Sequence, residues 1–179
     1  MGKAWNHFKT ITYHKYLVAQ GCFRIGLYKQ GILHDLSKYS PTEFRVGMKY
    51  YQGNRSPNNA EREDIGYTGA WLHHKGRNKH HYEYWIDYSM QTAPGSMIPV
   101  PMPDQYLAEM VMDRIAASKV YEGRNYTDAS PLKYYLRGKG KVPIHPQTAE
   151  ELEHILRMLA RYGEGKTCRY IRRKLLKKS

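Results

Sequence analysis

The sequence predicts an all-α protein that folds as a single compact helical domain. Apolar side chains recur every three or four residues over most of the chain, which is the pattern of amphipathic helices. Serine-proline pairs at Ser40-Pro41 and Ser130-Pro131 combine a capping side chain with the residue preferred at the first helical position. Strand patterns are sparse, and no internal repeat is visible.

Length and composition favour one folded unit. A chain of 179 residues can bury one substantial core but is short for two domains. Hydrophobic residues make up 41% and aromatic residues 13%, which argues against a disordered chain. We expect a helical domain over residues 1–165 and a basic C-terminal helix or tail over residues 166–179.

The charge and the cysteines limit the partners and the compartment. Lys and Arg number 29 against 16 acidic residues, and the net charge of +13 attracts phosphate-bearing molecules or anionic surfaces. Cys22 and Cys168 are far apart and outside any C-x-x-C pair, so neither a disulfide framework nor a cysteine zinc site is indicated. Without a signal-peptide pattern or an apolar run of membrane-spanning length, we expect a cytoplasmic protein. The oligomeric state stays open.

The first two helices lead to a His-Asp pair. Apolar spacing predicts an amphipathic helix over residues 5–20, which contains His14. Gly21 indicates a break, and a second helix over residues 22–33 ends beside the pair.

The next segment is rich in helix starts and interruptions. The capping box of Ser40 to Glu43 starts a helix that runs to about residue 51, and turn formers predict a loop over residues 53–59. Residues 60–89 are expected to be mainly helical, with an interruption at residues 75–79 because glycines weaken the segment.

Four prolines and a glycine exclude a regular helix from residues 92–103, which we expect to form a loop over the core. Asp104 is a candidate N-cap, and Thr148 with Glu151 forms a second capping box. Further helices are expected over residues 104–121 and 130–136, from Thr148 onward and over residues 166–179.

The stretch with the clearest chemical potential is Leu33-His34-Asp35-x-x-Lys38. Adjacent side chains on a helix point about 100° apart, so His34 and Asp35 can reach one ion only at a helix end or from its two sides. His14 and Asp113 lie on other expected helices and are candidates to complete a metal site. Imidazole and carboxylate ligands suit several divalent ions. We expect one or two bound ions, and the metal can be Mn, Fe, Co, Ni, Zn or Mg.

Two histidine doublets follow. His73 and His80 are seven residues apart, as are His74 and His81. Seven helical residues rise about 10 Å, which is too far for one ion unless the segment bends at Gly76.

The order His14, His34-Asp35, the doublets and then Asp113 resembles the signature of the HD superfamily, which comprises helical, metal-dependent phosphohydrolases. The resemblance implies an HD-like fold and one ion held by His14, His34, Asp35 and Asp113. Resemblance to binuclear members implies a second ion held by some of the doublet histidines, for which we choose His73 and His80. Resemblance to mononuclear members implies that these histidines line the phosphate pocket instead.

The resulting hypothesis is a metal-dependent phosphohydrolase that acts on a nucleotide or other phosphate ester through a metal-activated water. Lys38 is assigned to both catalysis and phosphate binding. Either Glu43 or Glu83 would orient the attacking water or tune a histidine. The other residues assigned to the substrate phosphate are Arg77, His73 and His81.

Longer stretches resemble a family of small, uncharacterised bacterial and phage proteins. They are Ser-Pro-Thr-Glu-Phe at residues 40–44, Arg-Asn-Lys-His-His at residues 77–81, and Pro-Met-Pro at residues 101–103 with Glu109-Met110-Val111. This second resemblance covers most of the chain but implies no known activity.

Two alternatives remain. The charge of +13, the basic C-terminus and the many tyrosines suit a nucleic-acid-binding module without catalysis. A nucleotide-sequestering protein would keep the metal pocket but not hydrolyse its ligand. Ser37 stands where the best-known phosphodiesterase subgroup has glycine, and no Gly-Tyr-Pro follows the doublets, which argues against a cyclic-dinucleotide substrate.

Overall fold

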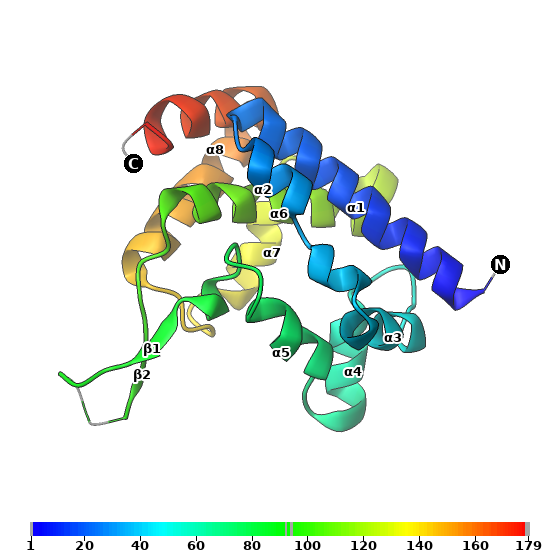
Figure 1. Ribbon diagram of the computed structural model, residues 1–179. Helices are drawn as coiled ribbons and strands as arrows, with labels where there is room; N and C mark the ends of the chain where they lie inside the picture. Colours follow the sequence, from blue (N-terminus) through cyan, green and yellow to red (C-terminus); the bar gives the residue numbers. More distant parts are fainter. Residues whose placement is uncertain (1, 92, 94, 178–179) are drawn as a thin grey trace.

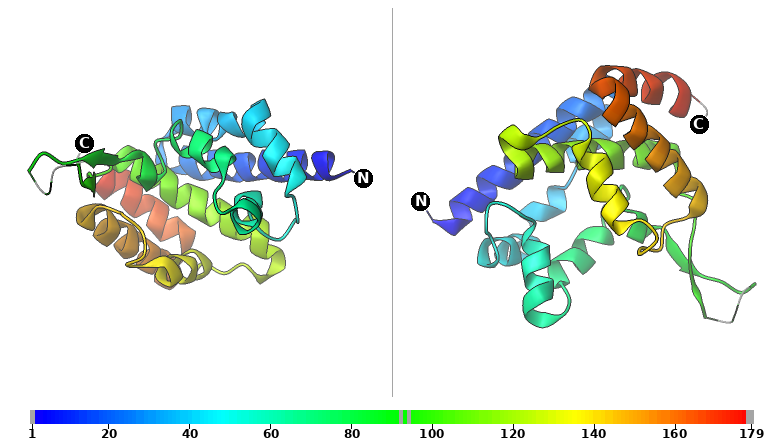
Figure 2. Two further views of the ribbon diagram at one scale, coloured as in Figure 1. Left: turned by 90° about the horizontal axis from the view of Figure 1, so that it is seen from below. Right: turned by 180° about the vertical axis from the view of Figure 1, so that it is seen from behind.

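The computed structural model describes residues 2–91, 93 and 95–177 and confirms the all-α prediction (Figure 1). Three long helices form the frame, namely α1 (Lys3–Ile25), α6 (Asp104–Glu122) and α8 (Pro146–Tyr170). Helix α1 packs against both α6 and α8, and the C-terminal end of α8 lies beside α1 in each ribbon view (Figure 2). Their shared interior is apolar and includes Val18, Val111, Leu152, Ile155 and Leu156, all fully buried.

Helix α1 runs through Gly21, so the break expected there is wrong. A Cβ at Gly21 would lie 2.7 Å from the Sδ of Met112, which shows that the missing side chain lets α1 and α6 approach closely. The helix ends instead at Gly26, whose φ of 89° is readily adopted by glycine.

Short helices follow α1 and build one side of the molecule. Their order is α2 (Tyr28–Leu33), η1 (Leu36–Tyr39), α3 (Pro41–Lys49), α4 (Pro57–Ile65) and α5 (Gly69–Lys75). Helix α3 starts as predicted, because the Ser40 hydroxyl accepts a hydrogen bond from the Glu43 backbone N–H at 3.4 Å. The loop expected over residues 53–59 is shorter, because Pro57 begins α4.

The segment after α4 is less helical than predicted. Gly66 ends α4 with a φ of 82°, and α5 ends at Lys75, where an interruption was expected. Residues 82–84 form a 3₁₀ turn, η2, and β1 (Ile86–Tyr88) then pairs antiparallel with β2 (Met97–Pro99). The helical assignment up to residue 89 is therefore wrong, because the proline-rich return supplies a strand partner.

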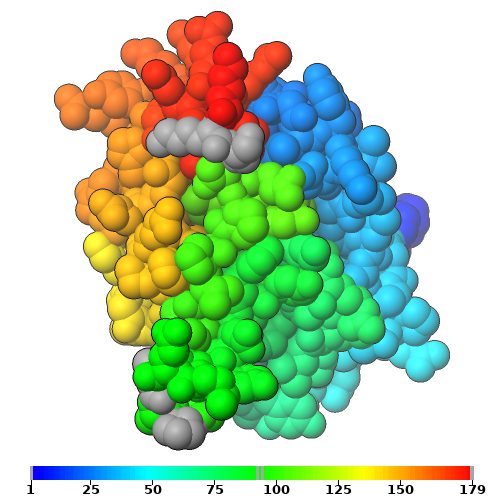
Figure 3. Space-filling model, turned by 60° about the vertical axis from the view of Figure 1, so that its left-hand side comes forward, coloured from blue at the N-terminus to red at the C-terminus, as the bar shows by residue number. Residues whose placement is uncertain are grey.

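The β1–β2 hairpin projects from the helical body (Figure 1) and forms the lower edge of the surface in Figure 3. Part of the loop predicted over residues 92–103 is thus β2. Residues 92 and 94 lie outside the described residues.

The C-terminal half contains η3 (Gly123–Asn125), α7 (Ser130–Gly138) and α8. Helix α8 starts at Pro146 rather than at Thr148, because His145 Nδ1 accepts from the Gln147 N–H. The Thr148 hydroxyl instead accepts from the Met102 N–H, which fixes the segment before α6 to α8.

The basic C-terminal segment belongs to the same core. Helix α8 is interrupted at Gly163 (φ 78°), continues to Tyr170 and ends in a π-helical turn over Ile171–Leu175. Ile171 and Leu175 are buried, while Arg172, Arg173 and Lys174 face solvent. Among the described helices, none combines the length and apolarity needed to cross a bilayer.

Candidate metal centre

The His-Asp pair lies in the turn between α2 and η1, where the chain reaches the interior. Both His34 and Asp35 are 2% exposed. Asp35 has a φ of 54° and a ψ of 25°, the one left-handed conformation of a non-glycine residue in the described chain. Such a conformation is costly for a side-chain-bearing residue, so the surrounding structure must hold it. A strained, buried carboxylate points to a functional role at this turn.

A first cluster gathers four ligand atoms from three separate elements. His14 comes from α1, His34 and Asp35 from the turn, and Asp113 from α6. His14 Nε2 lies 2.9 Å from Asp113 Oδ1 and 3.6 Å from Asp35 Oδ2. His34 Nε2 lies 3.2 Å from Asp35 Oδ2 and 3.6 Å from Asp113 Oδ1. The two nitrogens and two oxygens therefore alternate around a common centre.

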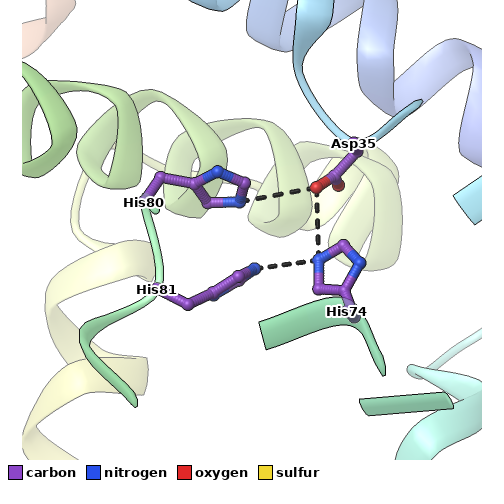
Figure 4. Close-up of side chains that lie close together, drawn as sticks. All are labelled: Asp35, His74, His80 and His81. Atoms are coloured by element: carbon purple, nitrogen blue, oxygen red, sulfur yellow. Dashed lines mark hydrogen bonds and ion pairs between the residues drawn. The ribbon is translucent and has the colours of Figure 1, made fainter. Parts of the chain in front are cut away.

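A second cluster uses the other oxygen of Asp35 (Figure 4). Asp35 Oδ1 lies 3.2 Å from His74 Nε2 and 3.4 Å from His80 Nε2. His81 Nε2 completes the group at 2.9 Å from His74 Nε2. The bend expected after α5 makes this arrangement available, because it folds His80 and His81 back towards His74. Asp35 is thus shared between two sets of imidazoles.

The contact geometry suits cations better than mutual hydrogen bonds. The Nε2 atoms of His14, His34 and His80 and both carboxylate oxygens of Asp35 are buried but have no hydrogen bond. Leaving a buried polar group unsatisfied typically costs about 1–3 kcal/mol. Ligands about 2.0–2.2 Å from one ion lie roughly 2.9–3.6 Å apart at octahedral or tetrahedral angles. The observed separations of 2.9–3.6 Å in the first cluster fall in this range.

Two further carboxylates orient the histidines from behind. Glu109 Oε1 lies 2.8 Å from His34 Nδ1 and 3.1 Å from His80 Nδ1. When Nδ1–H donates to a carboxylate, the Nε2 lone pair is left for a metal. Glu43 plays the same part for His74, whose Nδ1 lies 2.8 Å from Oε2. Three ligand histidines are therefore held with Nε2 towards Asp35.

Electrostatics keep the carboxylates ionised. Burial alone would raise the pKa of Asp35, but His34, Lys38 and His74 outweigh it and hold the pKa well below its usual value. Burial would likewise raise the pKa of Asp113, and the neighbouring imidazoles of His14 and His34 hold it well below its usual value. Ionised carboxylates are the form that binds a cation.

Two histidines of the second cluster are kept neutral. Burial and the neighbouring imidazoles of His80 and His74 hold the pKa of His81 well below its usual value. Burial and the charge of His34 also lower the pKa of His80. Burial would lower the pKa of His34 as well, but carboxylates, Asp35 first among them, hold it well above the usual value.

Lys38 lies at the edge of the first cluster. Its Nζ is 2.5 Å from Asp35 Oδ2, and its side chain is 29% exposed. Burial would lower its pKa, but the charges of Asp35 and Asp113 raise it, so the ammonium group stays protonated. Asp113 is also partly exposed, whereas His34 and Asp35 are not. The cluster is therefore open to solvent on the side of Asp113 and Lys38.

Most residues predicted for the site come together. His14, His34, Asp35, His80 and Asp113 all supply atoms to the clusters. Lys38 contacts Asp35, and Glu43 contacts a histidine of the second cluster, as its expected tuning role requires. His81, assigned to the substrate phosphate, lies in the second cluster instead.

Three other residues predicted for the site lie outside the clusters. His73 points to Glu43, with Nδ1 2.6 Å from Oε1, and its place in the cluster is taken by His74. Neighbouring residues on a helix point in different directions, and the packing of α5 on α3 selects His74. Arg77 is exposed and donates to the His73 carbonyl, and Glu83 lies on η2 outside the clusters.

His74 was not chosen as a ligand from the sequence, and Glu109 was given no role at the site. Glu109 entered only through the family resemblance, although it is an acidic residue in the apolar run Leu107–Val111, four positions before Asp113 on the same helix. Residues four apart share a helix face, so the pair could have been connected with the same site. His74 could be chosen over His73 only from tertiary packing.

The fold and site define an all-α protein with two adjoining, buried histidine-carboxylate clusters that can hold divalent cations. The chain belongs to a family of unknown function, DUF5662, whose model matches residues 3–158. This range includes every residue of both clusters. Neither the curated proteins nor the solved structures contain a match to the chain.

Proposed function

We propose that this protein is a metal-dependent phosphohydrolase with two divalent cations, acting on a nucleotide or another phosphate ester. The observation that carries the proposal is the position of Asp35. Its Oδ2 faces His14 and His34, and its Oδ1 faces His74 and His80. A carboxylate between two ligand sets suits a bridge between two cations, as in binuclear hydrolytic sites.

The donor atoms fit first-row divalent metals. The first cluster offers two imidazole nitrogens and two carboxylate oxygens, and the second offers three nitrogens and one oxygen. Mixed nitrogen and oxygen donors suit Mn, Fe, Co, Ni or Zn, whereas Mg prefers oxygen alone. The first cluster would hold an ion through four protein atoms, and its partly exposed side at Asp113 and Lys38 would admit water and substrate.

Divalent cations bound there would lower the pKa of a water and polarise a phosphoryl oxygen. The residues of the chain supply the remaining requirements. Glu109 and Glu43 fix the ring orientations of the ligand histidines, and the deep burial of His34 and Asp35 excludes bulk water from behind the site. The ammonium group of Lys38, on the open side, would bind a phosphate oxygen and stabilise developing charge. The order of His14, His34-Asp35 and Asp113, which resembles that of the HD superfamily, supports the same reaction class.

The test combines elemental analysis with activity. The purified full-length chain should contain up to about two equivalents of metal and hydrolyse phosphate esters or nucleotides with added Mn or Co. The double variant His34→Ala, Asp35→Ala should lose most of both. Exposed His154 on α8 provides the matched control, and His154→Ala should retain both. Equal metal content and activity in the double variant would remove the pair from the mechanism.

The same measurements also distinguish a phosphohydrolase from a nucleotide-sequestering protein. Metal binding and tight nucleotide binding without turnover of phosphomonoesters, phosphodiesters or nucleotides would indicate sequestration. The nucleic-acid-binding alternative is favoured by the exposed Arg172, Arg173 and Lys174. Salt-dependent nucleic-acid binding by a chain that purifies without metal would support it.

A further inference from the structure

A cavity of about 310 Å³ lies between α6, α7, η2 and the segment that leads into α8. Its wall includes two arginines and three tyrosines, namely Arg114, Arg137, Tyr82, Tyr134 and Tyr135. No acidic side chain lines it among the residues that the structure describes. A volume of this size is at the lower end of the range for small-molecule sites, which is about 300–1,000 Å³.

Arg114 presents an unused donor in this wall. Its Nε is buried and has no hydrogen-bond partner. More than about nine in ten buried polar groups in proteins have a partner, so the unpaired Nε of Arg114 is an exception. The planar guanidinium group matches phosphate and carboxylate through paired N–H donors. Exposed Arg137 adds a second positive charge near the cavity mouth.

The tyrosines indicate a planar group beside the anion. Tyr135 is 6% exposed and donates its hydroxyl to the Ala149 carbonyl, so its ring is fixed in the wall. Tyr134 is 62% exposed and stands at the opening. Aromatic side chains stack on nucleobases with little dependence on the base, because every base has a π-face.

The cavity is connected to the metal clusters by the chain itself. Arg114 directly follows Asp113, and Tyr82 directly follows His81. The cavity wall and the clusters therefore draw their residues from the same two stretches of chain, α6 and the segment after α5.

We propose that this cavity binds the nucleoside part of a nucleotide substrate, with Arg114 on a phosphate oxygen and the tyrosines against the base. The role of the ligand as substrate rests on the proposed phosphohydrolase function. Binding of the nucleotide in the cavity is a separate statement and is tested separately.

The binding experiment uses the full-length protein as purified and isothermal titration calorimetry. The probe is the phosphonate analogue of adenosine 5′-monophosphate, in which a CH₂ group replaces the ester oxygen and prevents hydrolysis. Arg114→Gln should weaken binding at least about tenfold, because a charge-assisted contact is lost. Tyr134→Ala should weaken it by a similar factor through lost stacking, and this exposed residue can be changed without disturbing the core.

Arg169→Gln is the charge-matched control, because Arg169 lies exposed on α8, and it should bind like the wild type. Circular dichroism checks that each variant is folded. If Arg114→Gln does not fold, the affinity of Tyr134→Ala alone tests the cavity assignment. Unchanged affinity in the folded variants, or no binding by the wild type, would overturn the cavity assignment.

Metal analysis and turnover separate this inference from the proposed function. A chain that binds the analogue through Arg114 but contains no metal and hydrolyses no nucleotide would retain the cavity and disprove the hydrolase. A chain that contains metal and hydrolyses nucleotides equally well with Arg114→Gln and Tyr134→Ala would retain the hydrolase and disprove the cavity as its substrate site.

Discussion

Glu109 provides the sharpest test of the metal centre, because one carboxylate oxygen contacts a histidine from each cluster. Glu109 Oε1 is 2.8 Å from His34 Nδ1 and 3.1 Å from His80 Nδ1. The substitution Glu109→Gln keeps the size and an acceptor oxygen but removes the negative charge. It should make both imidazoles weaker ligands.

Loss of a hydrogen-bond partner behind a metal ligand typically lowers metal affinity about 10- to 100-fold. Since Glu109→Gln keeps an acceptor, we expect about tenfold weaker binding of each ion. Glu109→Ala removes both hydrogen bonds, and we expect it to weaken the binding of each ion about 100-fold. Both ions should be affected, because His34 belongs to the first cluster and His80 to the second.

The assay is competition with a chelator of known affinity, followed by elemental analysis of the protein fraction. Exposed Glu150 on α8 provides the isosteric control, and Glu150→Gln should bind metal like the wild type. Unchanged affinity in Glu109→Gln and Glu109→Ala, or weakening of one ion alone, would refute the inference that Glu109 orients a ligand in both clusters.

Three further predictions concern stability. Gly47→Ala would place a Cβ 2.1 Å from His7 Nε2, so we expect the free energy of unfolding, measured by chemical denaturation, to fall by about 1–3 kcal/mol. The control Gly165→Ala, which has open space in α8, should be neutral or stabilising. Equal effects of the two substitutions would contradict the packing. Burial, with a smaller effect of Lys38, lowers the pKa of His7 to about 4, below the unfolded value of 6.5. As the pH falls, the unfolded chain therefore binds this proton before the folded chain does, and stability is lost between pH 6.5 and 4. Between pH 7.5 and 5 the free energy of unfolding of the wild type should fall by up to about 2 kcal/mol more than that of His7→Gln. Parallel curves of unfolding free energy against pH would refute this. Chelation should lower the Tm, because cations held by the buried histidines and carboxylates would stabilise the folded state. A Tm that is independent of added Mn or Co would count against a metal centre.

Local signals in the sequence determined much of the helical framework. The Ser40 cap and the spacing of apolar residues are properties of neighbouring positions, and the resulting helices are present. The first-cluster residues His14, His34, Asp35 and Asp113 could also be chosen in advance, because their residue types suit a metal site and their order resembles that of the HD superfamily.

Tertiary packing decided the rest. Gly21 lies within a continuous helix because Met112 packs against it, and β1 exists because the later segment Met97–Pro99 returns beside it. His74 rather than His73 reaches Asp35 because the contact between α5 and α3 fixes the rotation of α5 about its axis. Glu109 gained its role only when α6 placed it behind two histidines from other elements. Sequence periodicity specifies which face of a helix is apolar, but the distance between two side chains on different elements depends on how those elements pack.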